Sequence, residues 1–227
     1  MRDSPETIEN SLPARLPGHE SCGRRCWRDV EAVPAPGDAP RFRILYVCTG
    51  NLCRSPLAER LTRSVLGPCP ALQVISAGTH AELGKQMAER AQRVLIRLGG
   101  DPGGFVSRPL TPELVAAADL VLTAGSEHRA ESVARHFPAV TLAFTITEFG
   151  TLAQAVPSAA VTRHEDPVSR AHTLIAEVRA LRGLVRVDRP DIPDPYGGSW
   201  LAYRIAGRRI ATSLAVPLRL LTHSPSS

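Results

Sequence analysis

One stretch of ten residues constrains the fold of this chain more than any other. Val47–Pro56 reads VCTGNLCRSP and directly follows FRILY (42–46), so that 42–47 is a short apolar run of β-branched and aromatic residues. Such a run predicts a buried strand. Apolar residues then recur near helical spacing across 56–66, and Pro56 suits a first helical turn. The stretch is therefore predicted to be a tight loop between a strand and a helix.

The residue types in this loop suit the binding of an anion. The start of a helix presents free backbone N–H groups and a partial positive charge. Gly50 and Asn51 tolerate the backbone twist that such a loop needs, and the Arg54 guanidinium matches two phosphate oxygens. Cys48 lies at the carboxyl end of the strand, where the same groups favour a nucleophilic thiolate. The loop is predicted to hold an anion above a reactive cysteine.

Three other interpretations of the loop lack residues that they need. A G-x-x-x-x-G-K-[ST] phosphate loop requires a lysine, and this stretch has none. A zinc site requires a second pair of ligands, and the C-x4-C spacing differs from the C-x2-C of thioredoxin-type sites. The C-x3-C pair Cys22 and Cys26 is interpreted as two free thiols. We expect no metal and no cofactor.

Strands alternate with helices along the rest of the chain, which predicts an α/β fold of three layers: a four-stranded parallel sheet with helices on both faces. The further strands are expected at 72–76, 119–124 and 139–144. The further helices are expected at 85–99, 111–118, 126–137, 168–184 and 199–221, with Gly99-Gly100 ending the first of them and Thr111 capping the second.

Composition suggests one domain with unstructured ends. Residues 1–40 hold six of the 20 prolines and no apolar periodicity, so we interpret them as a disordered leader. Residues 41–222 form the domain, with a helical insertion at about 151–190. Residues 223–227 are expected to be a disordered tail.

The charge is unevenly distributed. The net charge is +5, but residues 1–40 hold five arginines and seven acids, so the remainder carries about +7. That surplus is interpreted as a solvated arginine-rich surface or as attraction for an anionic substrate. Nucleic acid is not expected as a partner, because only five Phe, three Tyr and two Trp are available for base stacking. No apolar run suits a membrane span or a secretory signal, so we expect a cytoplasmic protein without a membrane partner.

The motif Cys48–Pro56 resembles the C-x5-R-[ST] signature of the low-molecular-weight protein tyrosine phosphatases, especially bacterial and actinobacterial ones. The similarity continues in SAGTHA (76–81), ADLVLTAGSEHR (118–129) and DIPDPYGGS (191–199), and it covers about residues 41–222. The resemblance implies a flavodoxin-like fold. It also implies hydrolysis of phosphotyrosine or other aryl phosphate monoesters through a cysteinyl-phosphate intermediate, with a phosphotyrosine protein as the substrate and partner.

A phosphoester leaving group needs a proton, and two Asp-Pro pairs compete to supply it. Asp194 is followed by Tyr196, which could wall an aromatic substrate, and by two glycines that permit a tight loop. Asp166 is followed by a predicted helix start, so we interpret it as a charged turn or helix cap. Asp191 is a lesser rival inside the same loop as Asp194. We predict that Asp194 is the acid.

The resemblance also implies roles for the remaining site residues. Cys48 attacks phosphorus and Arg54 holds the equatorial oxygens. Ser55 donates a hydrogen bond to Cys48, while Asn51 and Ser76 hold the loop in shape. The residues expected to bind substrate are Thr49, Gly50, Asn51, Leu52, Cys53, Ser55 and Tyr196.

Four further residues carry expectations of their own. Cys53 is either a small apolar filler or a reversible disulfide partner that shields Cys48. Many family members have a histidine near Phe105, so we expect the surroundings of the loop to be loosened or rebuilt here. Trp200 and Tyr203 are expected to pack the last helix.

Two other functions were weighed. An arsenate reductase of the same fold relays a disulfide to further cysteines, and only Cys69 follows the loop. A catalytically weak phosphotyrosine-binding regulatory protein is disfavoured by the joint presence of Cys48, Arg54 and Asp194. The expected oligomeric state is a monomer or a weak dimer.

Overall fold

The computed structural model describes residues 42–222, so the predicted leader and tail, with Cys22 and Cys26, lie outside the described residues. Its centre is a four-stranded sheet in the order β2-β1-β3-β4, and every pair of neighbouring strands is parallel. The predicted parallel α/β sheet is confirmed. The strands are β1 (Phe42–Cys48), β2 (Leu72–Gly78), β3 (Leu120–Thr123) and β4 (Ala143–Thr145).

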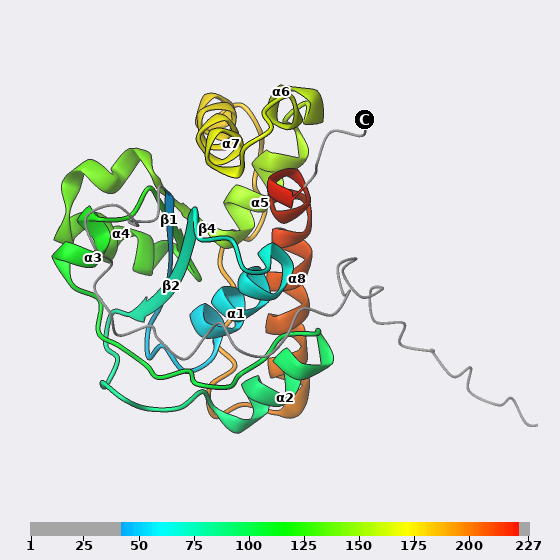
Figure 1. Ribbon diagram of the computed structural model, residues 1–227. Helices are drawn as coiled ribbons and strands as arrows, with labels where there is room; N and C mark the ends of the chain where they lie inside the picture. The colour runs from blue at the N-terminus through cyan, green and yellow to red at the C-terminus, as the bar shows by residue number, and fades with distance from the viewer. Residues whose placement is uncertain (1–41, 223–227) are drawn as a thin grey trace, which may run out of the picture.

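Helices cover both faces of this sheet (Figure 1). Side chains of β1 alternate between the faces: Ile44 and Tyr46 enter the larger apolar core, whereas Leu45 and Val47 enter a smaller one. The larger core is closed by α1 (Arg54–Leu66) and α8 (Trp200–Thr222), and the smaller one by α3 (Pro112–Ala116) and α4 (Ser126–Arg135). The three predicted layers are therefore present.

Two predicted elements differ from the structure more than the others do. The helix expected at 85–99 is shorter, as α2 (Glu89–Arg97). Its first residues form loop contacts instead: Lys85 exchanges hydrogen bonds with Ser107, and the Ala88 N–H donates to the Leu52 carbonyl. Backbone groups used in this way are not free to begin a helix.

The strand expected at 139–144 is wrong in its first half. Phe137–Thr141 forms a 3-10 helix, η1, and only Ala143–Thr145 pairs with β3. Pro138 favours the first turn of a helix, and local bonds such as Leu142 N–H to the Ala139 carbonyl close the turn. The apolar content of the segment reflects burial of the turn, because Ala139 is buried.

A helix that the sequence analysis did not predict as an element of its own follows β4 directly. In this helix, α5 (Ile146–Gln154), Thr145 and Glu148 form a reciprocal capping box. The chain continues through α6 (Ser158–Thr162) and α7 (Pro167–Leu181) to an irregular segment before α8. Within the described residues, no helix is long and apolar enough to cross a membrane.

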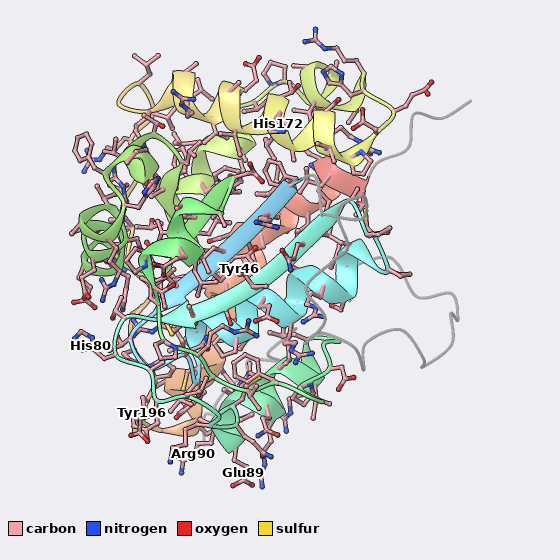
Figure 2. The ribbon with its side chains drawn as sticks, turned by 60° about the vertical axis from the view of Figure 1, so that its left-hand side comes forward. Tyr46, His80, Glu89, Arg90, His172 and Tyr196 are labelled. Atoms are coloured by element: carbon pink, nitrogen blue, oxygen red, sulfur yellow. The ribbon has the colours of Figure 1, made fainter. Side chains whose placement is uncertain are left out.

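Helix α7 lies at the end of the sheet where β1 begins. The His172 ring of α7 meets the Phe42 ring edge-on, with centroids 5.1 Å apart. Cys48 ends the same strand, and a strand of seven residues is roughly 20 Å long. Figure 2 shows this separation, with His172 at the top, Tyr46 in the centre and Tyr196 at the lower edge.

Candidate active site

The segment between β1 and α1 is a tight loop, and residues that follow β2 hold it by hydrogen bonds to its backbone. Asn51 has a φ of 52°, in the left-handed region that asparagine tolerates. The Thr79 N–H donates to the Cys48 carbonyl at 2.9 Å, and the His80 N–H to the Thr49 carbonyl at 3.0 Å. A Cβ added to Gly78 would lie 2.4 Å from the Thr49 carbonyl oxygen, so only glycine allows this close approach.

The cysteine at the end of β1 contacts the first turn of α1. Its sulfur lies 2.9 Å from the Ser55 hydroxyl, and Cys48 is buried. Cys53 is the N-cap residue of α1 and makes no side-chain cap hydrogen bond. The N–H groups of the first turn are thus not occupied by a capping side chain, which suits an anion placed over the sulfur.

Arg54 is buried and anchored from three directions. One guanidinium nitrogen donates to the Ile192 carbonyl at 3.2 Å, and the other donates to Thr49 Oγ1 at 3.1 Å and to Asp194 Oδ2 at 2.7 Å. The third nitrogen, Nε, is buried without a hydrogen-bond partner among the described residues. A buried donor left unpaired is costly, so this atom favours an acceptor supplied by a ligand.

The structure separates the three candidate acids. Asp194 lies beside Arg54, and its Oδ1 accepts a hydrogen bond from the Tyr196 N–H at 3.1 Å. Asp191 instead accepts from the backbone N–H and the hydroxyl of Ser126 at the start of α4. Asp166 caps α7 by accepting from the Ser169 N–H at 2.8 Å, and the Ser169 hydroxyl and N–H together lower the pKa of Asp166. Asp166 therefore lies at the opposite end of the sheet from Cys48.

A buried chain of hydrogen bonds supports the loop from the side of β2. Asn51 Nδ2 donates to the hydroxyls of Ser55 at 2.9 Å and Ser76 at 2.8 Å. The Ser76 hydroxyl donates in turn to Glu59 Oε2 at 2.6 Å, and the other Glu59 oxygen accepts from Arg63 at 2.9 Å. Glu59 is buried, so this chain of hydrogen bonds fixes the side chain of Asn51, the loop residue with the left-handed backbone.

Phe105 lies outside this hydrogen-bond chain. It is buried in the larger core, and the Arg60 guanidinium lies 5.6 Å from the centre of its ring. Arg108 contributes through its backbone, whose N–H donates to Asn51 Oδ1 at 2.9 Å. The loop is therefore linked to Glu59 on α1 through Ser76, and the side chain of Phe105 takes no part in this link.

His128 is the residue of the site that the sequence analysis missed. It is fully buried on α4, and its Nε2 lies 2.8 Å from Thr49 Oγ1. Its Nδ1 is buried without a partner among the described residues. Burial and the nearby Arg54 lower the pKa of His128, so the neutral ring is favoured. His128 falls within the matching stretch 118–129, but its spacing does not pair it with Thr49, because Thr49 follows β1 and His128 lies on α4.

Beside the loop is a hollow that Leu52 and Tyr196 border. Its other lining residues include the exposed His80, Glu82 and Lys85. Tyr196 is 65% exposed, so its ring is available to a ligand.

The Cys53 side chain points elsewhere, into the larger core, with its sulfur 3.9 Å from the Tyr203 hydroxyl. Burial raises the pKa of the Cys53 thiol to about 12. Both cysteines of the loop are free thiols. Tyr203 and Trp200 pack against the same core, as expected.

Comparison with known proteins agrees with this arrangement. The family model described as "Low molecular weight phosphotyrosine protein phosphatase" matches residues 43–181. The matched range includes the loop and ends before Asp194, so the place of that acid rests on the geometry. Among the described residues, no group of three or more His, Cys, Asp or Glu side chains could hold a metal ion.

Individual relatives are named either as tyrosine phosphatases or as arginine phosphatases. The probable low molecular weight protein-tyrosine-phosphatase EpsP of Ralstonia solanacearum is 42% identical over 93 residues, which are 41% of this chain and 62% of that protein. The protein-arginine-phosphatase of Geobacillus stearothermophilus is 36% identical over 108 residues, 48% of this chain and 71% of that protein. The solved YwlE arginine phosphatase of the same species superposes with a TM-score of 0.56 at 27% identity, covering 82% of this chain and 99% of that one. The alignment with EpsP thus spans about three fifths of that relative.

Proposed function

The chain belongs to the low molecular weight phosphotyrosine protein phosphatase family, and from this premise we propose that it hydrolyses phosphotyrosine and other aryl phosphate monoesters. One observation carries the proposal: Cys48, the unpaired Nε of Arg54 and the Asp194 carboxylate meet at the uncapped start of α1. This is the set of groups that phosphoryl transfer to a thiolate requires.

In the proposed first step, the Cys48 thiolate attacks phosphorus in line with the bond to the leaving oxygen. A sulfur–phosphorus bond forms and the phosphorus–oxygen bond breaks. The backbone N–H groups of the loop and the Arg54 guanidinium hold the three equatorial oxygens, whose negative charge persists throughout. Asp194 gives its proton to the departing phenolate, so the alcohol leaves neutral.

In the second step, the carboxylate of Asp194 removes a proton from water. The resulting attack forms a phosphorus–oxygen bond, breaks the sulfur–phosphorus bond and returns Cys48 as a thiolate with release of phosphate. Ser55 stabilises that thiolate by donating its hydroxyl proton toward the sulfur, 2.9 Å away. The hydrogen bonds that run from Asn51 through Ser76 to Glu59 keep the loop in its shape during both steps.

The hollow favours an aryl phosphate over a phosphorylated guanidinium. Leu52 and Tyr196 offer an apolar wall and an exposed ring to an aromatic leaving group. A guanidinium leaving group is cationic when protonated and prefers a carboxylate partner, whereas Glu82, the carboxylate that lines the hollow, is paired with Lys85 at 3.2 Å. We therefore propose a phosphotyrosine protein as the substrate, although one relative is named for arginine phosphate.

The reaction needs Cys48 in its reduced form, which supports action in the reducing cytoplasm. An arsenate reductase is not favoured, because Cys69 lies beside the start of β2, at the end of the sheet away from Cys48. A monomer or weak dimer remains our expectation.

The decisive experiment measures release of inorganic phosphate from an aryl phosphate, a phosphotyrosine peptide and a phosphoarginine peptide, with chelator present. We expect turnover of the first two, and loss of that turnover in Cys48→Ser. Turnover that survives Cys48→Ser, or none in the unaltered protein, contradicts the proposed function. Faster hydrolysis of the phosphoarginine peptide than of the phosphotyrosine peptide would make phosphoarginine proteins the substrate class instead.

A further inference from the structure

A groove between α2 and α8 presents apolar side chains to solvent. Its floor consists of Val94, Leu98, Leu201 and Ile205. Leu201 is 58% exposed and Ile205 is 52% exposed, one helical turn apart on α8. Large apolar side chains this open to water, gathered in one groove, favour an interaction partner.

Three arginines line the same groove: Arg97, Arg204 and Arg208. Arg97 lies over the Trp200 ring, 4.9 Å from its centre. Arg204 and Arg208 form no ion pair within the described part of the chain. The whole of α8 contains no Asp or Glu. The groove therefore combines an apolar floor with uncompensated positive charge.

The groove begins beside the loop that carries Asp194. Arg90 of α2 donates a hydrogen bond to the Gly198 carbonyl, and α8 starts at Trp200. Figure 2 shows Arg90 and Tyr196 along the same lower edge of the molecule. Arg208 is about 12 Å along α8 from Trp200 at the usual helical rise. An extended peptide crosses that distance in roughly four residues.

We propose that this groove docks the part of a phosphoprotein substrate that flanks its phosphorylated residue, and that it selects segments carrying acidic and leucine-like side chains. The inference rests on the proposed function and names the substrate's sequence class. Acidic side chains pair with Arg204 and Arg208, and apolar ones cover Leu201 and Ile205. Charge complementarity favours this occupant over a basic or neutral segment.

The test compares phosphotyrosine peptides that differ only in one flanking segment. An acidic peptide carries Glu and Leu roughly five to nine residues from the phosphotyrosine, the distance that an extended chain needs to reach the groove. The comparison peptide has Lys in place of each Glu. Each peptide is made in two forms, with the segment N-terminal or C-terminal to the phosphotyrosine. The enzyme is compared with Arg204→Glu/Arg208→Glu and with the control Arg179→Glu/Arg219→Glu. The control changes the same charge on exposed arginines of α7 and the end of α8.

We expect kcat/KM for the acidic peptide to exceed that for the lysine peptide by about tenfold at low salt, in at least one placement. The preference should vanish in the groove variant and persist in the control. Hydrolysis of a small aryl phosphate, measured at physiological salt, should stay within about twofold in both variants, because this substrate does not reach the groove and charges act over only about 8 Å at that ionic strength. That measurement also shows that both variants fold.

Equal kcat/KM for the two peptides in the unaltered enzyme overturns the docking proposal, as does a preference that survives Arg204→Glu/Arg208→Glu. Binding to phosphatidylserine vesicles that the groove variant loses, without any peptide preference, assigns the groove to a lipid surface instead. Self-association that the groove variant loses assigns it to a second copy. In all these cases aryl phosphate turnover continues, so failure of the docking proposal remains distinct from failure of the proposed function.

Discussion

The carboxylate of Asp194 and the guanidinium of Arg54 lie 2.7 Å apart, although 140 residues separate them in the chain. The Asp194 side chain is 46% exposed and Arg54 only 5%. Because Asp194 is open to solvent, a phosphate that binds the same guanidinium can displace the carboxylate from Arg54 into water. The pair thus places the proposed acid next to the anion site and leaves it free to turn toward a leaving group.

Replacing Asp194 should slow the chemical step. Asp194→Asn keeps the shape and a hydrogen-bonding oxygen but has no acidic proton to transfer, so we expect kcat for a phenyl phosphate to fall by about 10²–10⁴. The loss should shrink for substrates whose leaving group is more acidic. Asp166→Asn is the matched control and should leave kcat within about twofold, because Asp166 caps α7 far from Cys48. A larger effect of Asp166→Asn than of Asp194→Asn would show that the acid is misassigned.

Removing the Glu59 carboxylate should weaken both the fold and the loop. In Glu59→Ala, the buried Ser76 hydroxyl loses its acceptor, so we expect the free energy of unfolding to drop by roughly 2–4 kcal/mol. Glu89→Ala is the matched control, since Glu89 and Arg93 form the same i,i+4 pair at the surface, and it should cost less than about 1 kcal/mol. Urea unfolding measures both. Similar losses in the two variants would mean that the buried chain adds nothing.

Acidification should destabilise the protein through His128. Its pKa is lowered in the folded state by burial and by Arg54, against opposing effects of Glu127, Glu131 and Asp194. The unfolded chain therefore takes up this proton first, and the free energy of unfolding falls as pH drops below about 6.5. His128→Gln keeps a group able to bond Thr49 but does not titrate, so its unfolding midpoint in urea should depend less on pH. Identical slopes between pH 5 and 7.5 would exclude this histidine as the cause.

Adding one methyl group at Gly150 should disrupt the packing of α5 on α8. A Cβ there would lie 2.2 Å from the Ser213 carbonyl oxygen, which is backbone and cannot turn aside. We expect Gly150→Ala to lower the free energy of unfolding by roughly 3 kcal/mol, as for severe overpacking. Thr151→Ala, the next residue of the same helix, should change it by less than about 1 kcal/mol. A stabilised Gly150→Ala protein would show that the two helices do not cross this closely.

Much of the site was readable from the sequence because it is local. Cys48 and Arg54 are fixed relative to each other by one strand end, one loop and one helix start, and a left-handed asparagine with a glycine beside it is a local signal. The alternation of strands and helices likewise predicted the parallel sheet. The apolar run at 139–144 misled, because burial alone does not distinguish a strand from a buried turn.

The sequence by itself therefore determined the loop, the proposed nucleophile and the class of fold. The residues that follow each Asp-Pro pair favoured Asp194 over Asp166, but only the tertiary structure brought Asp194 to Arg54 and put Asp166 on α7, at the far end of the sheet. It also brought His128 to Thr49 and Glu59 to Ser76. Contacts of this kind join residues from different elements, and their distances are set by how those elements pack, which no spacing along the chain encodes.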